Sequence, residues 1–192
     1  MLRLSDVGSK ELMLGIVSPE VSTRAYNEMR KCMEELTGIK FEVDVGDHKK
    51  VKPEDVVMEF SRNNVVAALY SRIDNELGRV IHKVILMDIN SAEVVGTILL
   101  SKAGLDISDE SMEDALREFA NIIIGAYAAV LSRFFNGRFE YSIPEVVVDY
   151  DTAIVTDLVL PIAEVSQEIV MHNVKIRSDE GSISMEVLTM MS

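Results

Sequence analysis

Four residues in the second half of the chain are spaced so that they could form one chemical site. They follow the pattern Asp114, three residues, Glu118, two residues, Asn121 and then twenty-two residues before Pro144. An asparagine amide offers a hydrogen-bond acceptor and donors without a charge, and a carboxylate can make a charge-assisted contact with a cation. An acid and an amide three residues apart occur on many solvated helices, so the longer pattern carries the specificity.

The residues around this pattern predict a long amphipathic helix that begins near Asp109. Its apolar positions recur at steps of three and four, which is the spacing of one buried helical face; they are Leu116, Phe119, Ile123, Tyr127, Val130 and Phe134. The opposite stripe carries Asp114, Glu118, Asn121 and Gly125, followed by the small residues Ala128, Ala129 and Ser132. We expect the helix to lie flat on a core and a partner surface to approach this stripe closely.

Composition limits the classes of protein to which the chain can belong. Its 192 residues are 48% hydrophobic and 27% charged, which is typical of one globular domain. No apolar run approaches the ~20 residues of a membrane helix, and the first fifteen residues lack the pattern of a secretory leader. A net charge of −13 and the absence of tryptophan argue against nucleic-acid binding. We expect a cytoplasmic protein that neither inserts into membranes nor binds nucleic acid.

Local signals predict a second long helix, from about residue 19 to 36. Ser18 can cap its N-terminus, Pro19 suits the first helical position, and Gly38 can adopt the left-handed conformation that ends a helix.

Alternating segments bounded by turn residues predict a largely antiparallel sheet. The predicted strands are residues 39–45, 55–60, 65–73, 79–87, 145–150, 167–177 and 183–190, with a polar loop at 46–54. A short helix capped at Asn90 and Ser91 and another at 151–165, interrupted or ended near Pro161, complete the prediction.

Two sequence shifts align the halves of the chain. A shift of 98 residues places Glu20, Phe41, Glu42 and Gly46 on Glu118, Phe139, Glu140 and Pro144, and a shift of 103 aligns GRVIHKVILM with GSISMEVLTM. We therefore predict a single domain over residues 1–192, made of two pseudo-repeats, about 16–87 and 109–192, joined by a short helical segment at about 88–108. Such a duplication predicts an α+β fold, an antiparallel sheet with two long helices packed on one face.

Three segments carry a resemblance to a known family. DALREFAN, IIIGAYAAVLSRFFNG and PEVVVDY resemble the signature region of the CheC, CheX and FliY family of chemotaxis phosphatases, and the likeness extends more loosely over nearly the whole chain, closest to CheC. The resemblance implies an enzyme of chemotaxis that hydrolyses the aspartyl phosphate of a CheY-type response regulator.

The resemblance also implies a role for each site residue. Asn121 would position the attacking water and Glu118 would pair with the receiver's lysine, with Asp114 and Pro144 as supporting positions. An acyl phosphate is already reactive, and the receiver brings its own metal ion and lysine, so the phosphatase needs only to place a water in line. We expect this chain to bind no cofactor or metal, and Mg²⁺ to be on the receiver partner.

The first pseudo-repeat keeps only part of the pattern. Glu20 and Thr23 align with Glu118 and Asn121, but Ile16 and Gly46 stand where the acid and the proline would be. CheC proteins commonly carry two sites, so we predict that Glu20 and Thr23 form a degenerate second site with weak or no activity. A helix-start acid is the simpler interpretation of Glu20.

Three alternatives remain open on the sequence. The chain could be a non-catalytic interaction module that binds a receiver or the receptor deamidase CheD. It could be a structural part of the flagellar switch, as FliY is, although that role goes with an additional C-terminal domain and the chain ends at Ser192. Asp44, Asp47 and His48 could be imagined as metal ligands, but their spacing matches no standard site.

Overall fold

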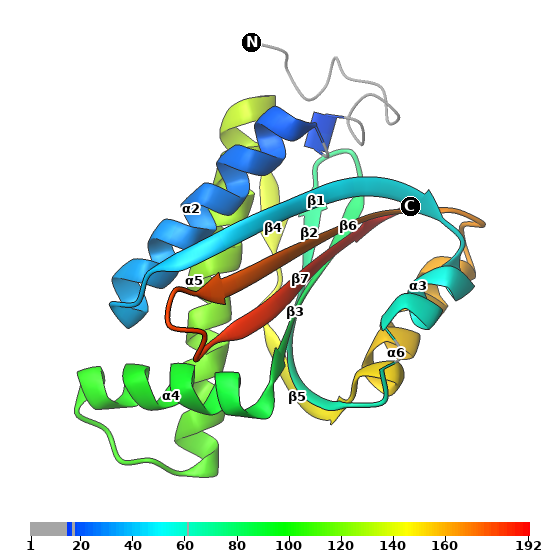
Figure 1. Cartoon of the computed structure of the whole chain (residues 1–192). Helices are drawn as coiled ribbons and strands as arrows, with labels where there is room; N and C mark the ends of the chain where they lie inside the picture. The colour runs from blue at the N-terminus through cyan, green and yellow to red at the C-terminus, as the bar shows by residue number, and fades with distance from the viewer. Residues whose placement is uncertain (1–14, 17, 61) are drawn as a thin grey trace.

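An antiparallel sheet of seven strands runs through the molecule, with helices on both faces (Figure 1). The computed structural model describes residues 15–16, 18–60 and 62–192. The sheet order is β1-β6-β7-β3-β2-β4, and β5 pairs with the same edge of β2 as β4 does, at residues 65–70 of β2 rather than 73–75. The strands are β1 (Phe41–Val51), β2 (Val65–Asn75), β3 (Val80–Asp88), β4 (Phe139–Tyr141), β5 (Glu145–Tyr150), β6 (Ile169–Ser178) and β7 (Ser184–Met191).

The two long helices, α2 (Pro19–Thr37) and α5 (Asp109–Phe135), pack against each other on one face of the sheet. The helix α4 (Ile89–Ala103) joins them at one end, and α3 (Pro53–Phe60) and α6 (Asp151–Ala163) cover the other face, as Figure 1 shows. Each face has its own apolar cluster. The predicted α+β class with both long helices on one face is confirmed.

The helix α2 begins and ends with the predicted chemistry, and α5 has a cap that was not predicted. The Ser18 side chain accepts from the backbone N–H of Val21, and Gly38 ends α2 with φ 77°. Ser108 caps α5 in a capping box with Ser111. The predicted apolar stripe of α5 is buried except for half-buried Phe134, whereas Ala128, which we expected on the open stripe, is buried in the core.

Two predictions about the segment after α2 were wrong. Residues 46–51, expected to be a loop, continue β1, because that strand pairs with β6 along its whole length. β1 is an edge strand, where exposed charged side chains discourage pairing with other molecules. Residues 55–60, expected to be a strand, form most of α3, since Pro53 starts a helix whose buried Val56 and Phe60 are four residues apart.

The predicted helix over residues 91–100 exists as α4, but Asp88 caps it rather than Asn90 or Ser91. The Asp88 carboxylate accepts from both the backbone N–H and the hydroxyl of Ser91. The remaining strands, the closing hairpin and α6 lie within a few residues of their predicted positions.

Within the described part of the chain, only α5 is long and apolar enough to cross a membrane by length and composition. Half of its most apolar window is buried inside the fold, and the core helix of a soluble protein passes the same test. The segment that we expect to carry no leader lies almost wholly outside the described residues.

The strand order is the same from either end if β1 is exchanged with the β4–β5 pair, β2 with β6 and β3 with β7. The helices exchange in the same way, α2 with α5 and α3 with α6, so α4 alone has no counterpart among the described elements. Gly78 and Gly181, which the 103-residue shift aligns, have the same φ of 71° in their turns. These matches support internal duplication, which we retain as a proposal.

At the aligned positions 46 and 144, both copies interrupt their first strand by different means. Gly46 lies in an irregularity of β1 between Val45 and His48, where a Cβ would be 2.7 Å from the Asn173 carbonyl oxygen. Pro144 lies in the gap between β4 and β5. Proline lacks the N–H that a strand ladder needs, so Pro144 divides the corresponding strand of the second copy into β4 and β5.

A lysine is completely buried where α2, α5, β3 and β7 meet. The Lys83 amine donates to the Thr189 hydroxyl at 2.9 Å and to the Tyr26 hydroxyl at 3.3 Å. It also lies 3.4 Å from the ring centre of Tyr127, and the Tyr26 and Thr189 hydroxyls are 3.0 Å apart. Among the described residues, no carboxylate pairs with this amine. Burial lowers the pKa of Lys83 well below its ordinary value of 10.5.

We predict that Lys83→Met raises the free energy of unfolding at pH 7 by about 1–4 kcal/mol, the range seen when apolar side chains replace a buried ion pair, because folding no longer has to desolvate an amine. Tyr26 and Thr189 can keep their mutual hydrogen bond. Between the lowered pKa of the folded state and 10.5, the folded state binds less of the Lys83 proton than the unfolded chain, so the wild type gains stability as pH rises through that range. The advantage of Lys83→Met should therefore shrink as pH rises towards 9.5.

Urea unfolding across this pH range measures the difference, and Lys175→Met, on the exposed side of β6, is the matched control. Below about pH 9 the tyrosines do not interfere, because Tyr26 and Tyr127 keep their protons both in the unfolded chain and in the folded state, where burial raises their pKa. A stability difference that is independent of pH would show that Lys83 keeps its proton on folding.

Candidate functional site

The exposed face of α5 brings together the two residues that the sequence singled out. Glu118 is exposed and Asn121 is half-buried, one helical turn apart on the side opposite the core. Within the described residues, neither side chain has a hydrogen-bond or ion-pair partner. Both groups are therefore free to contact another molecule without breaking a bond in this one.

Asp114 lies one turn before Glu118 on the same exposed face, but it is already engaged. Its carboxylate pairs with Arg117, which also pairs with Glu113. These contacts between residues three and four apart stabilise the early turns of α5 modestly. Asp114 therefore holds the neighbouring cation away from Glu118 rather than presenting a free acid.

Pro144 is buried and lies in the strand break beside α5. The residues before it are tied to β2, since the Ser71 hydroxyl donates to the Ser142 carbonyl at 2.9 Å and Ser142 accepts from the Arg72 N–H. This anchoring fixes the position of Tyr141, the last residue of β4.

Tyr141 is a site residue that the sequence analysis missed. Its hydroxyl is so close to Gly125 that a Cβ there would be 2.7 Å from the hydroxyl oxygen. Gly125 is one turn beyond Asn121 on the same face of α5, so the Tyr141 ring lies on the helix surface next to the Asn121 side chain. No spacing rule connects a strand tyrosine with a helix glycine sixteen residues earlier, and only the folded chain brings them together.

The degenerate second site is at the other end of the α2–α5 pair. Glu20 is in the first turn of α2, and both Glu20 and Thr23 are exposed. The two helices run antiparallel, because Leu36 of α2 lies with Glu118 of α5, while Arg24 lies with Phe134. The two sets of residues thus form separate surfaces.

An apolar groove of about 360 Å³ borders Glu118. It lies between the C-terminal end of α2, the C-terminal half of α4 and the first half of α5. Sequence reasoning could not find it, because its walls come from segments as far apart in sequence as Leu36 and Ile122.

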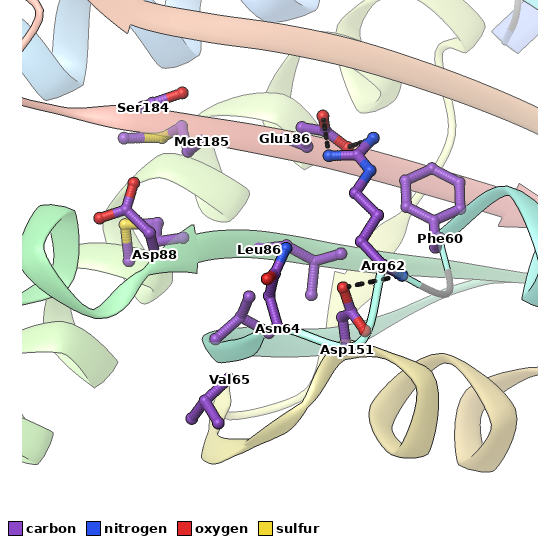
Figure 2. A pocket seen from close by; sticks show the side chains of 12 residues that line it. Phe60, Arg62, Asn64, Val65, Leu86, Asp88, Asp151, Ser184, Met185 and Glu186 are labelled. Atoms are coloured by element: carbon purple, nitrogen blue, oxygen red, sulfur yellow. Dashed lines mark hydrogen bonds and ion pairs between the residues drawn. The ribbon is translucent and has the colours of Figure 1, made fainter.

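A cavity of about 350 Å³ lies near α6, where β2, β3 and β7 approach the loop before β2 (Figure 2). Its polar groups bind one another. Figure 2 shows the Arg62 guanidinium against Glu186, with bonds of 2.9 and 3.2 Å, and the Asp151 carboxylate accepting from the Arg62 backbone N–H at 3.2 Å. Asp88 caps α4. The polar contacts that line this cavity therefore hold the loop and α6 in place. The polar side chains named here bind one another or cap a helix, so none of them is free to act on a ligand.

The possible metal ligands Asp44, Asp47 and His48 are exposed on β1. Across residues 15–16, 18–60 and 62–192, no group of three or more His, Cys, Asp or Glu side chains is arranged to hold a metal ion.

Solved structures with the same fold are chemotaxis and flagellar proteins. FliY from Thermotoga maritima is 17% identical, with a TM-score of 0.69, over 97% of this chain and 92% of that chain. CheX from Desulfovibrio desulfuricans is 15% identical, with a TM-score of 0.60, over 90% and 99%. CheX in a CheX–CheY–BeF₃–Mg²⁺ complex from Borrelia burgdorferi is 13% identical, with a TM-score of 0.58, over 88% and 97%. At these identities the likeness concerns the fold.

One segment of the sequence matches a family model. None of the curated proteins matches the chain. The family model described as "Chemotaxis phosphatase CheX" matches residues 78–162, a segment that contains α5 and the strand break with Pro144. The narrower expectation that CheC is the most similar member stays a prediction. Over this segment the chain is similar to the CheX phosphatases, and its fold is the one seen in CheX and FliY proteins.

Proposed function

We propose that this protein hydrolyses the aspartyl phosphate of a CheY-type response regulator. The observation that carries the proposal is the free pair of Glu118 and Asn121 on the exposed face of α5, inside the segment that matches the phosphatase family. Glu118 pairs with the receiver's lysine and Asn121 positions the attacking water. Asp114 and Pro144 support the pair, one by engaging Arg117 and the other by ending the strand that holds Tyr141.

The reaction needs little from the phosphatase. The water oxygen bonds to phosphorus, the bond between phosphorus and the aspartate oxygen breaks, and the products are the aspartate carboxylate and inorganic phosphate, which keeps both water hydrogens. The Asn121 carbonyl oxygen accepts one hydrogen bond from the water and so orients it. An amide cannot take the proton, so its contribution is positioning.

The partner in this proposal is a phosphorylated receiver that carries its own Mg²⁺. The Borrelia burgdorferi relative was solved with CheY, BeF₃ and Mg²⁺, which supports a CheY-type partner for this fold. A cytoplasmic location fits such a partner, and the apolar helix α5 is half-buried in the core. We propose no cofactor on this chain.

A second candidate function is a non-catalytic interaction module that binds a receiver or CheD. The first turns of α2 favour it. Glu20 and Thr23 are exposed there and could contact a partner, but that copy lacks the leading acid, the amide and the proline of the intact pattern. This alternative predicts binding without turnover.

We predict that Asn121→Ala lowers the rate of receiver dephosphorylation by about 10²-fold, the scale on which lost positioning is felt. The lifetime of a CheY-type receiver from the same organism, phosphorylated with acetyl phosphate, measures this rate. Asn27→Ala, the same change on the exposed face of α2, is the matched control. If Asn121→Ala hydrolyses at the wild-type rate, Asn121 does not position the water.

We predict that Thr23→Ala changes the same rate by less than about twofold, since a hydroxyl reaches less far than an amide and the strand break is absent from that copy. A large loss in Thr23→Ala would make the second site active. A wild type that binds the receiver or CheD without hydrolysis would establish the interaction module instead.

We predict that Glu118→Gln raises the KM for the phosphorylated receiver by about tenfold, because it removes one charge-assisted contact, and also weakens the dependence of KM on salt. Glu93→Gln, an exposed acid on α4 without an ion-pair partner among the described residues, is the matched control. An unchanged KM and salt dependence would contradict the pairing with a receiver lysine.

We predict that Gly125→Ala lowers the hydrolysis rate by about tenfold, because the new Cβ displaces the Tyr141 ring beside Asn121. Tyr141→Phe in the same chain removes the closest atom and should restore part of the activity. Circular dichroism and the unfolding temperature check that the helix is intact. Equal rates for Gly125→Ala and the wild type would show that Tyr141 has no part in the site.

A further inference from the structure

The groove beside Glu118 is an apolar surface that the fold leaves open. Its walls are Leu36 of α2, Leu99, Leu100 and Ala103 of α4, Leu105, and Ala115, Phe119 and Ile122 of α5. Leu105 is 59% exposed, so much of its apolar side chain is in contact with water, and covering it with a partner would be favourable. The volume of about 360 Å³ is at the small end of ligand-sized clefts and suits a large side chain.

The rim of this groove is acidic and is shared with the proposed catalytic pair. Asp114 and Glu118 line it directly, and Asp106, Asp109 and Glu110 lie on the adjoining loop and first turn of α5. A receiver that pairs with Glu118 must therefore cover the groove.

Two cations on the helices that form the groove, Lys102 of α4 and Arg117 of α5, already bind groups of this chain. Lys102 donates to the Leu36 carbonyl at 2.7 Å, and Arg117 pairs with Asp114 and Glu113. The rim thus presents net negative charge to a partner, which favours a partner surface with lysine or arginine around its apolar contact.

At the opposite end of the α2–α5 pair, the described residues form a smaller and more polar cleft. There the cleft is about 240 Å³ and is lined by Arg24, Glu28 and Arg133 together with Val130 and Phe134. The difference comes from α4, the helix without a counterpart, which supplies an apolar wall only beside Glu118. The apolar groove and the intact residue pattern therefore occur at the same end.

We propose that this groove receives an apolar side chain of the phosphorylated receiver, flanked on the receiver by basic residues, and so selects which receiver is dephosphorylated. This inference rests on the proposed function and names the feature of the substrate that the site recognises. The groove contributes to receiver affinity, whereas Asn121 contributes to the rate of the bound complex.

The test compares two exposed apolar residues of the loop between α4 and α5, Leu105 and Ile107. Leu105 lines the groove, and Ile107, which is 64% exposed, does not. Leu105→Gln should raise the KM for a phosphorylated CheY-type receiver by about 3- to 10-fold with kcat unchanged, the loss of one apolar contact. Ile107→Gln should leave KM within about twofold. Ala103→Trp, which fills the groove from an exposed position, should raise KM by more than about tenfold.

Binding of the receiver with beryllofluoride and Mg²⁺, followed by calorimetry, separates this proposal from the proposed function. An active wild type whose KM and receiver affinity are unchanged in Leu105→Gln and Ala103→Trp overturns the groove alone. An inactive wild type whose receiver binding weakens in both variants keeps the groove and overturns the phosphatase. A wild type that neither hydrolyses nor binds the receiver overturns both.

Discussion

The contact of the Lys83 amine with two tyrosines and a threonine fixes how the long helices lie on the sheet. An amine in an apolar core must find hydrogen-bond partners, and here they come from α2 and β7 while α5 supplies the ring of Tyr127. A slip of either helix by one turn would remove a partner from a group that water cannot reach. Because the inner face of α5 is held in this way, its outer face presents Glu118 and Asn121 in one fixed orientation.

The sequence predicted the parts of the structure that depend on local chemistry. The caps at Ser18 and Gly38, the apolar stripe of α5 and the exposed pair on its other face follow from periodicity and capping rules. It failed where distant pairing decides the outcome: β6 keeps a polar segment extended as β1, and α6 supplies the partner for the short helix α3. Tyr141 and the groove were missed for the same reason, since they exist only between segments remote in sequence.

The two halves of the domain differ in ways that concentrate function at one end. Gly46 lets β1 pass close to β6, whereas Pro144 divides the corresponding strand and leaves Tyr141 beside α5. The connecting helix α4 packs only against the end that carries Glu118. In our proposal, the two halves of the fold are nearly symmetric, and the active end differs from the other by three local features. These are Pro144, Tyr141 and the added helix α4.

Each half of the chain pairs its outer strand with a strand of the other half, and this pairing has a consequence for biosynthesis. β1 is completed at Val51, but its partner β6 begins only at Ile169. At about 5–20 residues per second, a ribosome needs on the order of ten seconds to make the intervening chain. During that time the nascent chain carries a strand without its partner, and the non-local pairing can close only after β6 has been made. The charged side chains along β1 then keep the waiting strand from pairing with a neighbouring nascent chain.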